Sequence, residues 1–128
     1  MRENIKYRVL GVMSGTSLDG VDLVVCTFNK SEKWGFEIEK SETIIYSNGW
    51  KKTLQFLHTK DSNTISKINL KYGQFIGDTI NTFLVSNRVD FIASHGHTIF
   101  HQPQNKYSLQ IGDGETIANI TGIPTIND

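Results

Sequence analysis

Hydrophobic residues in the first part of the chain fall into short runs that turn-forming residues separate. Residues 7–13, 22–28 and 34–46 are rich in apolar and β-branched side chains. Runs of this kind between polar turns are typical of β-strands. In the third run apolar side chains alternate with polar ones, at Phe36, Ile38 and Ile44. Because short connections join the three runs, they predict an antiparallel meander.

The hydrophobic period then changes to three or four residues, the spacing of an amphipathic helix. Residues 50–57 predict a short helix. Asp61 or Ser62 is the expected N-cap of a longer one, because a short side-chain oxygen accepts hydrogen bonds from first-turn amides. Its apolar positions are Ile65, Ile68, Tyr72, Phe75, Ile76, Ile80 and Phe83. Glycine costs about 1 kcal/mol relative to alanine in a helix, so Gly73 and Gly77 predict a close approach of this helix to the sheet.

The last part of the chain alternates between strands and a helix. Three further strands are predicted, over residues 91–94, 107–111 and 123–126. The first of them is expected to end in a polar loop at residues 95–98, at the edge of a site. Residues 112–114 open a short helix at residues 115–120, which Gly122 ends as a C-terminal cap. The order β-β-β-α-α-β-β-α-β predicts one mixed α/β domain with helices flanking a mixed sheet.

The composition excludes several classes of partner. The chain carries 13 Lys and Arg against 13 Asp and Glu, so it has no positive field for a nucleic-acid backbone or an anionic membrane. Its apolar runs are shorter than the ~20 residues that span a bilayer, and residues 1–4 lack the apolar core of a signal peptide. The single cysteine, Cys26, lies in an apolar run and is expected to be a buried thiol in a reducing compartment. We therefore expect a cytoplasmic protein.

The richest candidate for chemistry is the segment GVMSGTSLDGVD at residues 11–22. It places three glycines, three hydroxyl side chains and two carboxylates between two predicted strands. Glycines let the backbone approach a phosphate, amides and hydroxyls donate to its oxygens, and a carboxylate can hold Mg²⁺ through waters. The alternative is a hairpin whose glycines and hydroxyls serve only the turn. The segment matches neither the Walker loop nor the G-x-G-x-x-G pattern, which disfavours P-loop and Rossmann folds.

Five motifs give the chain a resemblance to a known family. They are GVMSGTSLDGVD at 11–22, SHGHT at 94–98, HQP at 101–103, LQIGD at 109–113 and IA..TGIP at 117–124. In this order they resemble the N-terminal part of anhydro-N-acetylmuramic acid kinase, a family of the sugar kinase, Hsp70 and actin superfamily. The resemblance implies an α/β fold, a ribonuclease-H-like lobe of an actin-like ATPase. Residues 1–128 would form this lobe as a single incomplete domain, without the second lobe.

The resemblance also implies an activity. With ATP and water, the family converts 1,6-anhydro-N-acetylmuramic acid, a product of cell-wall turnover, to the 6-phosphate of the opened sugar. A base-activated water attacks the anomeric carbon while the bridge oxygen leaves it and takes the γ-phosphoryl group. The general base is expected in an Asp-Thr-Gly-Pro-Gly-Asn motif later in the family's sequence. No catalytic residue is therefore assigned here, and residues 1–128 alone are expected to be inactive.

Carried over by position, the resemblance divides the motifs between nucleotide, metal and sugar. The phosphates of ATP are expected at Ser14, Gly15, Thr16, Ser17, Asp19 and Gly20. Mg²⁺ is expected at Asp19 and Asp22, and Asp19 ranks first because a carboxylate in the loop has no role in the core. The sugar is expected at His95, Gly96, His97, Thr98 and Asp113.

Two alternatives stay open. His95 and His97 lie two residues apart on an extended segment, hence on one face, so with His101 and Asp113 they are a candidate zinc site. The chain is also a candidate non-catalytic fragment that binds phosphate or a partner through the same fold. In either case the surface that faces the missing lobe is expected to be uncovered, which favours a homodimer.

Overall fold

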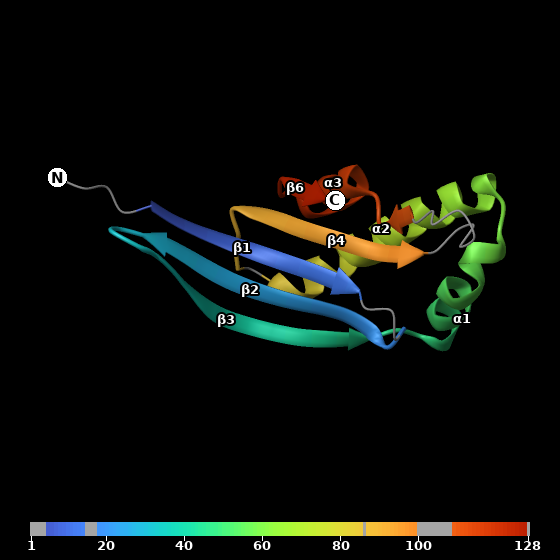
Figure 1. Cartoon of the computed structure of the whole chain (residues 1–128), viewed down its shortest axis with the longest axis horizontal. Helices are drawn as coiled ribbons and strands as arrows, with labels where there is room; N and C mark the ends of the chain where they lie inside the picture. The colour runs from blue at the N-terminus through green and yellow to red at the C-terminus, as the bar shows by residue number, and fades with distance from the viewer. Residues whose placement is uncertain (1–4, 15–17, 86, 100–108, 128) are drawn as a thin grey trace.

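The computed structural model describes residues 5–14, 18–85, 87–99 and 109–127, which form an α/β arrangement (Figure 1). Long strands build an extended arm, and the helices gather toward one end (Figure 1). The elements in chain order are β1 (Ile5–Ser14), β2 (Gly20–Lys30), β3 (Trp34–Ile45), α1 (Asn48–Phe56), the 3-10 turn η1 (Leu57–Thr59), α2 (Ser62–Leu84), β4 (Phe91–Ile99), β5 (Leu109–Ile111), α3 (Gly114–Thr121) and β6 (Thr125–Asn127).

Within the described ranges six strands form one mixed sheet. β1 pairs antiparallel with β2, and β2 pairs antiparallel with β3. β4 lies on the other side of β1 and runs parallel to it. β4 has a shared outer edge, where β6 pairs parallel with residues 92–94 and β5 pairs antiparallel with residues 97–99. The carboxyl ends of β1, β4 and β6 therefore point the same way, and segments far apart in the chain meet there.

The helices pack against one face of this sheet. Alternate strand residues point toward them, and Leu10 and Val12 of β1 are buried with Ile76 and Ile80 of α2. Burying one side chain of this size stabilises the fold by about 1.5–3 kcal/mol. The predicted N-cap of α2 is confirmed, since the carboxylate of Asp61 accepts a hydrogen bond of 2.8 Å from a first-turn amide. No helix in the described part of the chain is long and apolar enough to cross a membrane.

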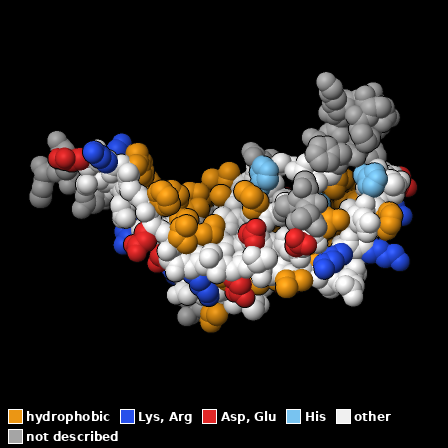
Figure 2. Space-filling view, turned by 60° about the horizontal axis from the view of Figure 1, so that its bottom comes forward, with side chains coloured by type: hydrophobic (Ala, Val, Ile, Leu, Met, Phe, Trp, Pro, Cys, Tyr) orange, Lys and Arg blue, Asp and Glu red, His pale blue; other side chains and the backbone are white. Residues whose placement is uncertain are grey.

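The opposite face of the sheet carries apolar side chains that no described element covers. Phe36 and Ile38 of β3 are 69% and 57% exposed. Figure 2 shows hydrophobic side chains gathered on one side of the arm. A groove of about 600 Å³ on this face is lined mainly by aromatic side chains, those of Tyr7, Phe28, Trp34, Phe36 and Phe91. Among the described residues, the sheet therefore has one packed face and one apolar face that remains open.

A β-bulge in β3 interrupts the alternation that the sequence predicts there. The pairing of β2 with β3 skips Glu39, so one extra residue stands in β3. Phe36 and Ile38, before the bulge, lie on the open face, whereas Ile44, beyond it, packs against the core. Cys26, expected to be buried, is only half-buried because its side of β2 is the uncovered face. The expected strand is confirmed as β3, but the expectation that its alternation is continuous was wrong.

β4 is also longer than predicted. Residues 95–98, expected in a loop, continue the strand to Ile99, because β1 pairs with His97 on one side and β5 pairs with it on the other. The strand is irregular at Gly96, whose φ of +71° lies in the left-handed region. A Cβ atom at Gly96 would lie 2.4 Å from the carbonyl oxygen of Ile111. This position therefore requires glycine for both its conformation and its space.

Gly73 and Gly77 do mark a close approach, but the partner differs from the predicted one. A Cβ atom at Gly73 would lie 3.0 Å from the backbone oxygen of Asp113, and one at Gly77 would lie 2.9 Å from Cβ of Ile120. At these positions α2 packs against α3 and the turn before it, and the predicted contact with the sheet was wrong. α3 itself ends at Gly122 in the left-handed conformation, as the sequence predicts.

Candidate functional site

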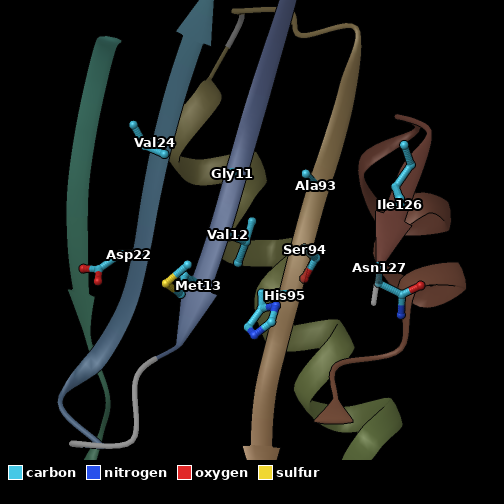
Figure 3. A pocket seen from close by; sticks show the side chains of 10 residues that line it. All are labelled: Gly11, Val12, Met13, Asp22, Val24, Ala93, Ser94, His95, Ile126 and Asn127. Atoms are coloured by element: carbon cyan, nitrogen blue, oxygen red, sulfur yellow. The ribbon is translucent and has the colours of Figure 1, made fainter.

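A pocket of about 410 Å³ lies on the open face, at the carboxyl ends of β1, β4 and β6 (Figure 3). On the β2 side it is lined by Asp22 and Val24. Figure 3 shows the imidazole of His95 directed from β4 toward β1, while Asp22 points from β2 toward β3. The parallel pairing of β1 with β4 and of β4 with β6 is what brings these residues to one edge.

A smaller polar pocket of about 100 Å³ adjoins the first one, because His95 and Asn127 line both. Gly96 and Asp113 also line it, so three of the residues predicted for a sugar meet here. Gly112 and Asn69 also line this pocket.

His97 and Thr98 line neither described pocket. Residues two apart on a regular strand share a face, yet His95 is exposed while His97 is only 3% exposed. The left-handed backbone at Gly96 breaks the alternation, and the ring of His97 turns to the helical side, where it lies 6.2 Å from the ring of Tyr72. The expectation that both histidines share a face was wrong.

The alternative of a zinc site at these histidines is contradicted for the part of the chain that the structure describes. His95 and His97 lie on opposite faces of β4, so they cannot hold one ion together. No group of three His, Cys, Asp or Glu among the described residues is arranged to bind a metal ion. His101, the third histidine of that alternative, lies outside the described residues.

A buried hydrogen-bonded chain holds His97 in place. Its Nδ1 lies 2.8 Å from Oγ of Ser14, which lies 2.5 Å from the phenol oxygen of Tyr46. The phenol of Tyr46 is hydrogen-bonded in turn to that of Tyr72. Burial lowers the pKa of His97 and raises the pKa of both tyrosines. At neutral pH the imidazole is therefore uncharged and both phenols keep their protons.

The segment predicted to bind phosphate is described at its two ends, and Gly15, Thr16 and Ser17 lie outside the described residues. At one end, the hydroxyl of Ser14 is buried and belongs to the hydrogen-bonded chain of His97, Tyr46 and Tyr72. At the other end, Leu18 has a φ of 60°, a strained value for a residue with a Cβ atom.

Gly20 has a structural reason to be glycine. A Cβ atom at this position would lie 2.2 Å from the carbonyl oxygen of Ile44 on the paired strand β3. A backbone hydrogen bond beside it also joins the two segments: the amide of Tyr46 donates to the carbonyl of Asp19 at 3.1 Å. Gly20 therefore serves the close approach of β2 and β3.

The two carboxylates of the segment lie in different surroundings. Asp19 is exposed in the turn before β2. Asp22 is exposed on β2, and its Oδ1 accepts a hydrogen bond of 2.5 Å from the hydroxyl of Thr43 on β3. Asp19 is the freer of the two for a metal ion, because the hydroxyl of Thr43 already occupies one oxygen of Asp22.

Asp113 is the N-cap of α3. Its Oδ2 accepts from the amide of Thr116 at 3.0 Å and from the hydroxyl of Thr116 at 2.6 Å. Its own amide donates to the carbonyl of Asn69 at 3.3 Å, and the side chain of Asn69 accepts from the amide of Gly112 at 2.7 Å. These bonds fix the turn that forms one wall of the smaller pocket.

Four residues of the site carried no signal in the sequence. Tyr46 and Tyr72 fit the hydrophobic pattern of a strand and a helix, and nothing marks their hydroxyls as partners. Asn69 and Asn127 are single polar residues outside any motif, and only the packing of α2 and the pairing of β6 bring them to the pocket.

Ser94, which lines the larger pocket, is buried, and its Oγ has no hydrogen-bond partner among the described residues.

A mixed sheet with helices on one face is consistent with an actin-like ATPase lobe, and so is a glycine- and hydroxyl-rich segment whose described ends line the larger pocket. The sequence pattern of one family, anhydro-N-acetylmuramic acid kinase, matches residues 7–128, and the chain belongs to this family.

Relatives that bear the name anhydro-N-acetylmuramic acid kinase cover almost the whole chain. The one from Pseudoalteromonas translucida is 36% identical over 94% of this chain, which corresponds to 34% of the relative. The relative from Acinetobacter baylyi is 35% identical over 93% of this chain and 32% of its own length. The relative from a Sulfurovum species is 34% identical over 96% of this chain and 36% of its own length. The chain therefore spans about a third of the length of the curated relatives it matches.

Proposed function

We propose that this chain is the N-terminal lobe of an ATP-dependent anhydro-N-acetylmuramic acid kinase that acts in cell-wall recycling in the cytoplasm. The observation that carries the proposal is the family match over residues 7–128. The finer fold assignment is a ribonuclease-H-like lobe. It is supported by the antiparallel pairing of β1 to β3, with β4 parallel to β1 and β6 parallel to β4.

The nucleotide is assigned to the segment between β1 and β2. Ser14, Gly15, Thr16, Ser17, Asp19 and Gly20 lie in it or at its ends. Backbone amides of such a segment, with the hydroxyls of Thr16 and Ser17, suit the β- and γ-phosphates. Mg²⁺ usually keeps several waters and takes one or two carboxylates together with phosphate oxygens. Exposed Asp19, with Asp22 near it in sequence, fits that requirement. When bound, the ion would neutralise charge on the phosphates.

The sugar is assigned to the smaller pocket. His95 can donate to and accept from a sugar hydroxyl, and the backbone of Gly96 lies beside it. Asp113 holds the opposite wall as the cap of α3. His97 and Thr98, expected here from the sequence, lie outside both described pockets, so the assignment rests on His95, Gly96 and Asp113.

In the proposed reaction a water molecule attacks the anomeric carbon and the anhydro bridge oxygen leaves it. That oxygen takes the γ-phosphoryl group of ATP, which gives the 6-phosphate of the opened sugar and ADP. This chain would bind and align ATP and sugar, an effect that can lower a barrier by several kcal/mol. The general base is assigned to a part of the family beyond these residues, so the chain alone is expected to be inactive.

The test is a chimera in which this chain replaces the matched third of the Pseudoalteromonas translucida relative. ADP release is measured with 1,6-anhydro-N-acetylmuramic acid and MgATP, beside the 128-residue chain alone. We expect sugar-dependent ADP release from the chimera and none from the chain alone. Asp19→Ala should abolish it, whereas Glu37→Ala, the loss of an exposed carboxylate on β3, should not.

A folded chimera without sugar-dependent turnover, beside an active parent relative, would contradict the proposal. If the 128-residue chain still bound MgATP in that case, the alternative of a non-catalytic phosphate-binding fragment would be favoured. Full activity in Asp19→Ala would remove only Asp19 from the nucleotide site. Turnover by the chain alone would contradict the assignment of the general base.

A further inference from the structure

The buried chain of hydrogen bonds joins four segments that are distant in sequence. Ser14 ends β1, Tyr46 follows β3, Tyr72 lies in the middle of α2 and His97 lies in β4. None of the four residues is more than 9% exposed. Buried polar groups are costly unless each finds a partner, so the direction of these bonds is constrained.

Counting protons fixes that direction. The three hydroxyls of Ser14, Tyr46 and Tyr72 supply three protons for the three hydrogen bonds. If Nδ1 of His97 is an acceptor, Tyr72 donates to Tyr46, Tyr46 to Ser14 and Ser14 to His97, and every bond has one proton. If Nδ1 carries a proton, four protons compete for three bonds. One buried proton then has no acceptor among the described residues, which is unfavourable.

We infer that His97, Tyr46 and Tyr72 are positioning residues that hold Ser14 through a one-way hydrogen-bond chain ending on a neutral His97 protonated at Nε2. The inference rests on the proposed function, because Ser14 opens the segment assigned to the phosphates of ATP. Its hydroxyl is committed to the interior of the lobe. Ser14 therefore contributes to phosphate binding by fixing the carboxyl end of β1, and its hydroxyl does not contact the phosphate.

The surroundings of His97 favour the neutral ring. The titratable groups that face it are the phenols of Tyr46, after β3, and Tyr72, on α2. Burial is the cause of its lowered pKa. Among the described residues, the charge of Asp22 on β2 raises the pKa of Tyr46 and so helps that phenol remain a donor. On β1 and β5 the neighbours paired with His97 are Ser14 and Ile111.

The first test measures the tautomer of His97 in the 128-residue chain by ¹⁵N NMR of its ring nitrogens at neutral pH. We expect the proton on Nε2, with Nδ1 unprotonated. A proton on Nδ1 in the folded chain would overturn the inference. This measurement needs no substitution, so it decides the direction of the hydrogen bonds even if a variant fails to fold.

The second test compares Tyr46→Phe with Tyr7→Phe, which removes the same hydroxyl from a tyrosine that is 43% exposed on the open face. Loss of one buried hydrogen bond should speed amide exchange at Met13 and Ser14 roughly fivefold. Tyr7→Phe should leave it unchanged. Equal exchange in the two variants would overturn the positioning role.

The same samples are then titrated with MgATP by calorimetry. We expect Tyr46→Phe to bind roughly fivefold more weakly, since the segment is held less firmly, and Tyr7→Phe to bind as the unaltered chain does. Equal affinity in the two variants would refute the link to the nucleotide. Absence of binding by the unaltered chain would count against the proposed function instead, and the tautomer and exchange results would still decide the inference.

Discussion

Gly20→Ala separates the structural role of this glycine from its expected role at a phosphate. The added Cβ atom would lie 2.2 Å from the carbonyl oxygen of Ile44, 2.9 Å from its carbonyl carbon and 3.1 Å from Cα of Ile45. An ordinary contact is at least about 3.4 Å, and all three atoms belong to the backbone, so no rotamer change relieves the overlap. β3 must move away from β2 by about 1 Å.

That movement lengthens the pairing of Gly20 with Ile45 and the 3.1 Å bond from the amide of Tyr46 to the carbonyl of Asp19. At about 1 kcal/mol for each of two or three bonds, we expect a loss of roughly 2–4 kcal/mol, a large part of the stability of a small domain. Urea unfolding followed by circular dichroism gives this value directly.

Gly35→Ala is the matched control. Gly35 lies in β3, and a Cβ atom there would meet nothing within 4 Å. Alanine lowers the entropy of the unfolded chain, so this variant should be neutral or more stable by up to about 1 kcal/mol. Equal unfolding midpoints for the two variants would refute the close backbone approach of β2 and β3 at Gly20.

Three further predictions concern the helices and His97. Gly77→Ala should destabilise the chain by about 1–3 kcal/mol in urea unfolding, because its Cβ atom meets Ile120 at 2.9 Å. Gly49→Ala in α1, where the nearest atom is 3.8 Å away, should instead be neutral or stabilising, and the same result for both would contradict the contact with α3. Asp113→Ala should cost about 1 kcal/mol through loss of the α3 cap, whereas Asp113→Ser should retain most of it, and equal midpoints would argue against capping. Because burial holds the pKa of His97 below its ordinary value of 6.5, the unfolded chain binds more protons just below that pH. Thermal unfolding should therefore show stability that is constant above about pH 6.5 and falls as the pH drops toward the folded pKa. His97→Asn, which keeps an acceptor, should flatten that fall, and an unchanged slope would mean that another group causes it.

Local chemistry explains why much of the fold could be predicted from the sequence. The N-cap Asp61 and the C-terminal cap Gly122 act within one helical turn, so their neighbours in sequence are also their partners in space. The strands β1 and β2 are continuous apolar runs whose pairing follows from a short connection. The five motifs that carry the family resemblance are likewise short segments of neighbouring residues.

Contacts between distant segments explain what the sequence did not predict. The glycine pair on α2 signalled a close approach, but only the packing of α3 showed that Ile120 is the partner of Gly77. The bulge at Glu39 depends on the register with β2, so the pattern of β3 alone could not reveal it. His97 turns away from His95 because Gly96 adopts a left-handed conformation against Ile111, a residue of another strand.

The sequence by itself determined most of the elements, the caps at Asp61 and Gly122 and the family, because these depend on residues that are near one another in the chain. The tertiary structure decided which side chains share a face and which hydroxyls are hydrogen-bonded to one another. Ser14, Tyr46, Tyr72 and His97 are scattered along 84 positions, 14 to 97. Only the packing of α2 beneath the parallel pair β1 and β4 brings them within hydrogen-bonding distance.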